Sequence, residues 1–432
     1  MPAFDFTSQT DAEFCIFDWA FPDVPIEQQF RIGFAVDPCR GRGLSVAVEG
    51  GIPANEVILT LPWTRVVTQS RVRSSLDRYE IANMGIIPRG IGWAREEIFK
   101  PLSDLHAWSL EVAVFLVTEM RNPKSWYKPW WRLLPVPLKL KRLAAISEGR
   151  SDSVTDLLLL LLNYDYKHNE EGDDFNYGNS ALQLLQDDAL ECEVMGEMKW
   201  LKLCYAHLFD ASALGSTINE PTTTCQFTGC DEQIPPCNRR NVLCPDHNAG
   251  PLVSFESFMW AFVLVRSRAM ELPNICREEE GLPMRVILPF IDMCNHSSSA
   301  NVRLEAAEDG VRLVSTRQLF ESDPILLDYG VRDLPSLARS FGFVPRNCYV
   351  ELNVGGVCIN SKPCDLKLDE HEATILSRQL SKLNYTEPDP AKIRSSSACS
   401  SLAKEYAAYR RSLVEDALAN CTIITTSTSQ IP

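Results

Sequence analysis

Three short segments, far apart in the sequence, carry residues suited to ligand binding and group transfer. They are Gly41-Arg42-Gly43-Leu44, then Asp292-Met-Cys-Asn-His-Ser297, and finally Tyr329-Gly330 with Phe341-Gly342-Phe343. Glycine lets the backbone approach a ligand closely, while an asparagine amide and a tyrosine hydroxyl both donate and accept hydrogen bonds. Each segment alone is more typical of a turn or a strand end, so the interpretation depends on their joint occurrence in this order.

Taken together, the segments resemble those of the SET-domain protein methyltransferases, specifically the type represented by the Rubisco large-subunit lysine methyltransferase. The resemblance runs from roughly Gly33 to Arg346, and it is strongest in Trp260-Ala261, in Arg266-Ser267-Arg268 and from Leu288 to Ser297. It implies methyl transfer from S-adenosylmethionine to a protein lysine. The cysteine-rich module that follows the SET domain of histone-type enzymes is absent, as is usual in this subclass.

The chemistry of methyl transfer to lysine sets what such a site must provide. With a pKa near 10.4, roughly one lysine in a few thousand is neutral at neutral pH, so presenting the free amine costs about 4–5 kcal/mol. A narrow apolar channel and the nearby sulfonium both disfavour the ammonium form. Aromatic walls align the amine, and oxygen atoms hold the methyl group through weak C–H···O contacts. No metal ion, catalytic acid–base pair or covalent nucleophile is required.

The resemblance also implies roles for individual residues. Cofactor binding is implied for a glycine-rich turn and two polar residues, namely Arg40, Gly41, Arg42, Gly43, Asn295 and His296. Substrate binding is implied for Arg268, Asp292, Tyr329 and Phe341. Tyr329 is also the implied catalytic residue, with its hydroxyl beside the reacting amine. Without the resemblance, the sequence would indicate a charge at a helix end for Arg268 and a turn residue for Asp292.

Three positions depart from the pattern of this family. Leu334 stands where an asparagine is usual, Phe341 replaces the tyrosine of a Tyr-Gly-Phe motif, and Ser322-Asp323-Pro324 replaces a Gly-Glu pair. The missing hydroxyl at Phe341 is expected to change the number of methyl groups accepted or the acceptor side chain. A protein-histidine methyltransferase of the same fold therefore stays open as an alternative. A catalytically weak SET-fold module that mainly binds proteins is a second one.

A cysteine-rich segment at 221–250 contains potential soft ligands for a metal. They lie within 23 residues and are Cys225, Cys230, Cys237, Cys244 and His247. Structural zinc needs four ligands in tetrahedral arrangement, and only Cys244 and His247 have the tight spacing of a zinc knuckle. Free thiols in an inserted segment are favoured over a zinc site, and the predicted chemistry does not depend on a metal.

Composition restricts the class of protein and of partner. The 432 residues carry a formal net charge of −15, which does not suit non-specific binding to nucleic acid and instead favours basic partners such as lysine-rich tails. The leucine run at 157–162 is too short to span a bilayer, so no membrane protein is expected. The acidic N-terminus and 15 cysteines without a secretory signal predict reduced thiols and a cytoplasmic or nuclear location. A monomer is expected.

Short strands and longer helices must position these segments. Hydrophobic periodicity and turn residues predict strands at 41–48, 56–62, 286–291 and 325–327, a hairpin of 301–306 with 311–316, and helices at 109–121, 255–270 and 406–414. A serine-rich stretch at 395–401 is predicted to interrupt the C-terminal helices. Strands at both ends of the core with helices between them indicate an α+β fold, not a dinucleotide-binding fold.

These elements suggest a division of the chain into parts. We expect an N-terminal extension at 1–24 and a SET-type β fold of short strands at 25–345, with a large helical insertion at about 90–253. The insertion includes the cysteine-rich segment. A mostly helical domain at 346–432 is similar in placement to the C-terminal substrate-binding domain of the subclass.

Overall fold

The computed structural model describes most of the segments singled out above. The described residues are 11–21, 31–37, 41–82, 84–122, 124–131, 133–134, 187–209, 253, 255–276, 283–345, 348–362, 366–383, 397–420 and 422–424. Arg40 and the whole of the cysteine-rich segment lie outside them, so the predictions made there stay predictions.

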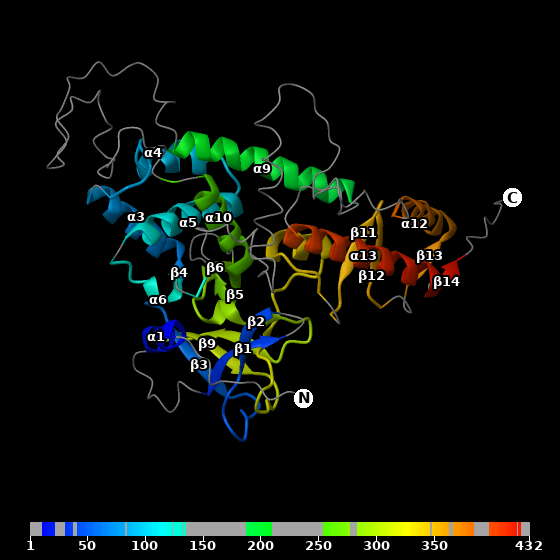
Figure 1. Ribbon diagram of the computed structural model, residues 1–432, viewed down its shortest axis with the longest axis horizontal. Coiled ribbons are helices and arrows are strands. Elements are labelled where there is room, and N and C mark those ends of the chain that lie inside the picture. The colour runs from blue at the N-terminus through cyan, green and yellow to red at the C-terminus, as the bar shows by residue number, and fades with distance from the viewer. Residues whose placement is uncertain are drawn as a thin grey trace, which may run out of the picture.

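The first strands form two small antiparallel groups near the N-terminal end of the chain (Figure 1). β1 (Ile32–Asp37) pairs with β2 (Gly41–Val46), and β3 (Val57–Pro62) pairs with β9 (Gly310–Ser315). β9 also pairs with β8 (Val302–Ala306) through the turn that contains Glu308, Asp309 and Gly310. The strands and the hairpin predicted in these stretches are confirmed.

A second three-stranded sheet, in the order β4-β6-β5, lies beside a long buried helix. Its strands are β4 (Val67–Thr68), β6 (Pro283–Ile287) and β5 (Ala269–Cys276). The helix predicted to reach residue 270 is α10 (Phe255–Arg268), and the chain enters β5 immediately after it. Ala269 and Met270 pair with residues of β6, so strand pairing overrides the helical pattern at this end.

Helices of the insertion pack against α10. The described helices before the cysteine-rich segment are α3 (Gln69–Ile81), α4 (Ile91–Ala94), η2 (Arg95–Phe99), α5 (Asp104–Arg121), α6 (Lys128–Trp131) and α9 (Asp188–Phe209). α5 contains the predicted helix. Every residue from Trp108 to Glu119 is buried, because α5 packs against α3 and α10 together.

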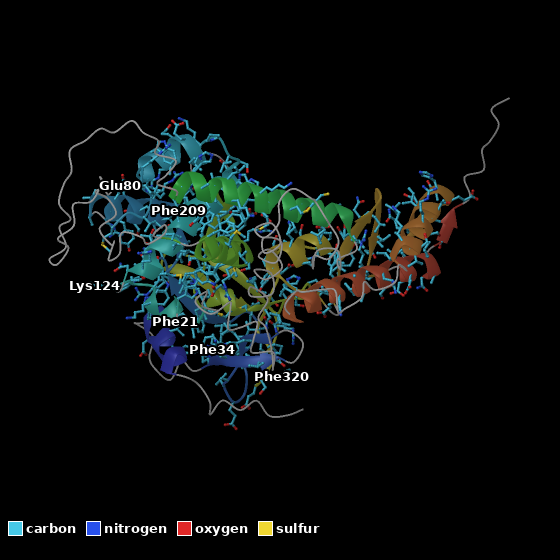
Figure 2. All side chains as sticks on the ribbon, turned by 45° about the horizontal axis from the view of Figure 1, so that its top comes forward. Phe21, Phe34, Glu80, Lys124, Phe209 and Phe320 are labelled. Atoms are coloured by element: carbon cyan, nitrogen blue, oxygen red, sulfur yellow. The ribbon has the colours of Figure 1, made fainter. Side chains whose placement is uncertain are left out.

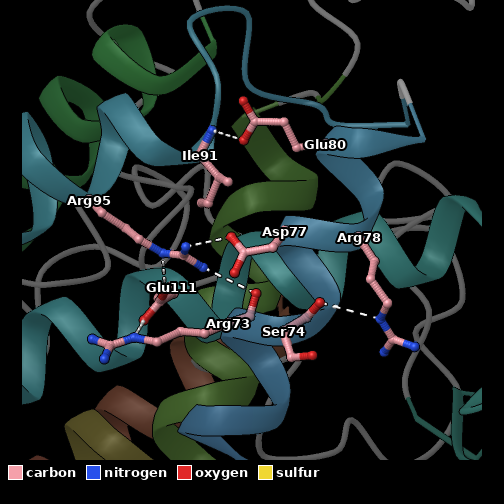
Figure 3. Close-up of polar contacts among 8 residues, drawn as sticks. All are labelled: Arg73, Ser74, Asp77, Arg78, Glu80, Ile91, Arg95 and Glu111. Atoms are coloured by element: carbon pink, nitrogen blue, oxygen red, sulfur yellow. Dashed lines mark hydrogen bonds and ion pairs between the residues drawn. The ribbon is translucent and has the colours of Figure 1, made fainter.

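Glu111 on α5 is buried and therefore needs partners. Glu111 is 2% exposed, and its carboxylate accepts from Arg95 Nε at 2.8 Å and from Arg73 Nε at 3.1 Å. Arg95 also donates to Asp77 at 2.5 Å, so one cluster joins α3, η2 and α5 (Figure 3). Removing Arg95 would leave the buried Glu111 carboxylate with Arg73 as its remaining ion-pair partner in this cluster, and weaker compensation of a buried charge is destabilising.

The N-terminal helix α1 (Asp11–Ala20) is part of the core of the β fold. Phe17 lies with its ring centroid 5.9 Å from that of Phe34 on β1 and 4.9 Å from that of Phe290. Phe21 contacts Phe290 at 5.1 Å, and both Phe21 and Phe34 lie near the strands in Figure 2. Residues 11–21 thus pack into the β fold, and the N-terminal extension at 1–24 stays a prediction.

The C-terminal part combines two long helices with short strands (Figure 1). Its elements are β11 (Glu351–Val354), β12 (Val357–Asn360), β13 (Lys367–Asp369), α12 (Glu370–Leu383), α13 (Ser397–Asn420) and β14 (Thr422–Ile424). The final helix is confirmed, but the predicted serine-rich interruption is wrong from Ser397 onward because those serines lie in α13. The four strands of this part were not predicted from the sequence.

α9 joins this C-terminal part to the rest of the molecule. Asp187, just before the helix, accepts a hydrogen bond from the Tyr406 hydroxyl at 2.7 Å and lies 3.5 Å from Arg410 Nε. All three side chains are buried.

Among the described residues, no helix has the length and hydropathy needed to cross a bilayer. The boundary proposed at residue 346 stays a prediction.

Candidate active site

The second and third predicted segments meet in a parallel strand pair. β7 (Asn295–His296) pairs with β10 (Leu326–Leu327), and the Ser297 amide donates to the Leu327 carbonyl at 3.0 Å. Tyr329 follows β10 by two residues. Its hydroxyl donates to the Cys294 carbonyl at 2.6 Å, and its amide donates to His296 Nδ1 at 3.3 Å. Both ends of Tyr329 are therefore fixed against the segment 294–296.

The first segment reaches the same place through β2. A Cβ atom built on Gly43 would lie 2.3 Å from Asn295 Nδ2 and 3.0 Å from its Cγ, far closer than side-chain carbons approach. Only glycine leaves the Asn295 amide in its observed position. The β2 backbone is held there because the Ile325 amide donates to the Leu44 carbonyl at 2.8 Å.

An aromatic cluster extends from this junction. The Tyr329 ring lies 5.0 Å from the ring of His296 and 4.9 Å from that of Phe341. Phe343 lies 5.9 Å from His296 and 6.3 Å from Phe341. Phe341 ends η7 (Leu337–Phe341), and Gly342 then takes a left-handed conformation with φ 70, which favours glycine. The four rings form one continuous wall.

A buried ion pair lies beside this wall. Arg268 Nη1 donates to the Asp292 carbonyl at 3.0 Å and to Asp292 Oδ2 at 3.1 Å. The Asp292 side chain has no exposed surface. Burial raises the pKa of Asp292, while the charge of Arg268 and a hydrogen bond from Trp130 act in the opposite direction. The Arg268 charge thus compensates the carboxylate.

A strained residue directs Asp292 into this position. Phe290 is fully buried and has φ 79, a conformation that costs about 1–3 kcal/mol for a residue other than glycine. It immediately precedes η6 (Ile291–Met293), the short helix that contains Asp292. The aromatic contacts of Phe290 with Phe17, Phe21 and Phe34 stabilise this backbone.

The Tyr329 hydroxyl lies in a low-dielectric environment. Desolvation, followed by the nearby Cys294 thiol, raises its pKa well above the ordinary value of 10.0. Tyr329 as a residue is half-buried. Burial likewise raises the pKa of the Cys294 thiol. Both groups are protonated at neutral pH and neither is poised as a base or nucleophile.

The structure thus brings together most of the residues predicted from the sequence. They are Gly43, Arg268, Asp292, Asn295, His296, Tyr329 and Phe341. Gly41 begins β2, and the exposed Arg42 places its guanidinium 4.7 Å from the ring centroid of Phe34. Among the described residues, no cluster of three or more histidine, cysteine or acidic side chains could hold a metal ion.

One residue that contacts the site was not predicted from the sequence, and one departure from the family pattern lies in the core. No role was predicted for Trp130, but its Nε1 donates to Asp292 Oδ2 at 3.1 Å. No local signal could have identified this contact, because 162 positions separate the two residues. Leu334, which stands in place of the usual asparagine, is fully buried at the start of α11 (Leu334–Ser336) and belongs to the core.

This arrangement is the SET fold of the Rubisco LSMT type. The SET domain of LSMT bound to lysine and AdoHcy matches with a TM-score of 0.52 at 14% identity, over 95% of this chain and 91% of that chain. Rubisco LSMT bound to AdoMet matches with a TM-score of 0.51 at 13% identity and the same coverage. At such identities the likeness concerns the fold.

Sequence comparison gives a shorter match. SET domain-containing protein 8 of Schizosaccharomyces pombe is 28% identical over 94 residues, which are 22% of this chain and 20% of that protein. The matched region thus spans about a fifth of the relative's length. No family model matches the chain.

Proposed function

We propose that this chain is an S-adenosylmethionine-dependent methyltransferase that acts on a lysine side chain of a protein. The observation that carries the proposal is the convergence at β7, where Gly43 meets Asn295, and Tyr329 meets Cys294 and His296. The shared fold with solved structures bound to lysine, AdoHcy and AdoMet supports it.

The glycine-rich strand and β7 suit the proposed cofactor. Gly43 keeps the side-chain space beside Asn295 open, and Asn295 offers an amide that both donates and accepts hydrogen bonds. We assign Arg40, Gly41, Arg42, Gly43, Asn295 and His296 to cofactor binding. When bound, S-adenosylmethionine supplies an electrophilic methyl group on a cationic sulfur.

The chain's own residues would orient the acceptor amine. The Tyr329 hydroxyl donates its hydrogen to the Cys294 carbonyl, and its oxygen lone pairs can still accept weak C–H···O or N–H···O contacts. The rings of Tyr329 and Phe341 would hold the lysine stem, and their apolar surroundings disfavour the ammonium form. Because burial keeps the phenol neutral, Tyr329 acts by orientation and not as a base.

The charge of the chain suggests the class of protein substrate. A net charge of −15 attracts basic partners over distances of about a Debye length, roughly 8 Å at physiological ionic strength. We propose a lysine-rich protein as partner, with no direct role for nucleic acid. A monomer in the cytoplasm or nucleus remains part of the proposal, and size-exclusion chromatography and cell fractionation test it.

One observation favours a second acceptor. Phe341 carries no hydroxyl, yet its ring lies against Tyr329 at 4.9 Å, so the wall beside the acceptor is less polar than a pair of tyrosines. A histidine side chain is the alternative acceptor that this change could admit. Mass spectrometry identifies which side chain carries the methyl group.

The decisive experiment supplies the purified chain and isotopically labelled S-adenosylmethionine to cell extract. We expect labelled methyl groups on lysines of one or a few proteins. Cofactor binding is measured separately, by thermal shift with S-adenosylmethionine or S-adenosylhomocysteine. Binding without transfer would leave a SET-fold module that binds proteins, and the absence of both would contradict the proposal.

Tyr329→Phe tests the catalytic assignment within the site. The ring and its stacking remain, whereas the hydroxyl and its bond to the Cys294 carbonyl are lost. We expect kcat to fall about a hundredfold while the Kd for S-adenosylhomocysteine changes less than about threefold. An unchanged kcat would remove Tyr329 from the catalytic role.

A further inference from the structure

Trp130 lies against the candidate site although it belongs to the helical insertion. It is fully buried on the short helix α6, and its indole Nε1 donates to Asp292 Oδ2 at 3.1 Å. The same carboxylate oxygen accepts from Arg268 Nη1, also at 3.1 Å. One atom of Asp292 therefore joins a residue of the insertion to the ion pair beside Tyr329.

This junction matters because Asp292 is charged in an apolar place. A buried carboxylate keeps its charge only when donors compensate the lost hydration. Asp292 has two such donors, the Arg268 guanidinium and the Trp130 indole. Burial raises the pKa of Asp292, and each of these donors acts to lower it. Arg268 in turn is oriented by two oxygen atoms of Asp292, the carbonyl oxygen and Oδ2.

The turn before Trp130 is rigidly fixed. Glu119 on α5 is buried and accepts hydrogen bonds from the hydroxyls of Tyr79 and Ser125. Ser125 Oγ also accepts from the Tyr127 amide at 3.2 Å, so the chain that leads into α6 is tied to α5. Tyr127 packs its ring 6.3 Å from that of Trp130. The indole is therefore held in place before any ligand binds.

We propose that Trp130 is a positioning residue for the methyl transfer. Trp130 holds the Asp292 carboxylate, which in turn fixes Arg268 and the backbone of η6. The chain continues from η6 to Cys294, whose carbonyl accepts the hydrogen bond from the Tyr329 hydroxyl. The catalytic part of this inference rests on the proposed function. The coupling between Trp130 and Asp292 does not, and it can be measured without any transfer reaction.

The experiment compares Trp130→Phe with Trp126→Phe. The first removes the indole N–H but keeps a buried ring, and the second changes an exposed tryptophan of the same segment that stacks on Arg65. We expect Trp130→Phe to lower kcat about tenfold with the Kd for S-adenosylhomocysteine unchanged, and to move the acidic limb of the pH–rate profile to higher pH. Trp126→Phe should match the wild type.

A double-mutant cycle with Asp292→Asn separates positioning from packing. If Trp130 acts through Asp292, Trp130→Phe should have a much smaller effect on kcat in the Asp292→Asn background. The cycle is repeated on urea unfolding at pH 7, which reports the contact even in a chain without transfer activity. Trp130→Leu, which is apolar and has no hydrogen-bond donor in its side chain, provides a second variant should Trp130→Phe fold poorly.

The outcomes distinguish the positioning role of Trp130 from the proposed methyl transfer. Additive effects in both cycles, or a pH profile identical to the wild type, would overturn the positioning role. Coupling in unfolding with no methyl transfer by the wild-type chain would overturn the proposed function and the catalytic part of this inference, while the contact itself would stand.

Discussion

Gly43 and Asn295 form a contact in which the absence of a side chain on one residue sets the place of another. The nearest atom to a Cβ on Gly43 would be Asn295 Nδ2, at 2.3 Å. That atom belongs to a side chain, so the fold could accommodate alanine by moving the amide and little else. The residue that moves is the one assigned to cofactor binding.

Gly43→Ala should therefore weaken the cofactor more than the fold. We expect the Kd for S-adenosylhomocysteine to rise about tenfold, corresponding to one displaced hydrogen bond of about 1.4 kcal/mol. The urea midpoint should change little. Calorimetric titration measures the first and chemical unfolding the second. Gly92→Ala is the matched control, since no heavy atom lies within 4 Å of a Cβ built there. Equal affinities in all three proteins would contradict the assignment.

The raised pKa of Asp292 predicts that the stability of the protein depends on pH. The folded pKa of Asp292 is raised above the ordinary 3.8. The protonated form is thus favoured by folding, and this stabilisation is complete below pH 3.8 and lost as the pH rises through the folded pKa. Asn does not titrate. Between pH 3.8 and the folded pKa of Asp292, the free energy of unfolding of Asp292→Asn should therefore increase relative to that of the wild type. Above the folded pKa, the two curves of free energy against pH should be parallel. Urea unfolding between pH 3 and 8 measures the difference, and parallel curves throughout would exclude a raised pKa.

At the scale of elements, α9 holds the helix that leads to Phe341. Glu197 on α9 forms a mostly buried ion pair with Arg266. Arg266 also donates to the Arg339 carbonyl at 3.0 Å and to Ser340 Oγ at 3.3 Å. Arg339 reaches back to Glu193 at 2.6 Å. Both contacts end in η7, whose last residue stacks on Tyr329. α9 in the insertion therefore stabilises the position of η7, which carries Phe341 of the aromatic wall.

The two glutamates of α9 should differ in importance. The side chains of Glu197 and Arg266 are 13% and 14% exposed, whereas Glu193 is 57% exposed. Glu197→Gln should destabilise the protein by about 2–4 kcal/mol because it leaves Arg266 buried with less compensation. Glu193→Gln should cost less than about 1 kcal/mol. Chemical unfolding gives both values, and hydrogen exchange should rise at 337–343 in Glu197→Gln alone. Equal effects would refute the distinction.

At the scale of the whole molecule, buried polar contacts at the start of α9 join the C-terminal part to the helical insertion. Tyr406 on α13 is fully buried, and its hydroxyl donates to Asp187 at 2.7 Å. Burial, then the charge of Asp187, raises the pKa of Tyr406, so the phenol stays a donor at all ordinary pH. Asp187 Oδ1 accepts from the Leu190 amide at 3.2 Å and thereby caps α9 as well.

Tyr406→Phe tests this connection. It leaves the Asp187 carboxylate buried with one donor fewer, so we expect a loss of about 1.5–3 kcal/mol in the free energy of unfolding. Tyr409→Phe on the same helix is the control, because among the described residues the Tyr409 hydroxyl makes no hydrogen bond to Asp187. Thermal unfolding by calorimetry distinguishes them. Similar midpoints for the two variants would show that the contact contributes little.

Local patterns in the sequence determined the strands at 41–48 and 56–62, the hairpin around Gly310, the buried helix after residue 254 and the three segments that meet at β7. Such patterns act between near neighbours, through turn residues and through side chains that must face a core. The tertiary structure alone decided that α10 ends at Arg268, that β13 pairs with β14, and that Trp130 reaches Asp292. Those outcomes depend on contacts between residues far apart in the chain, and packing of the whole molecule selects them.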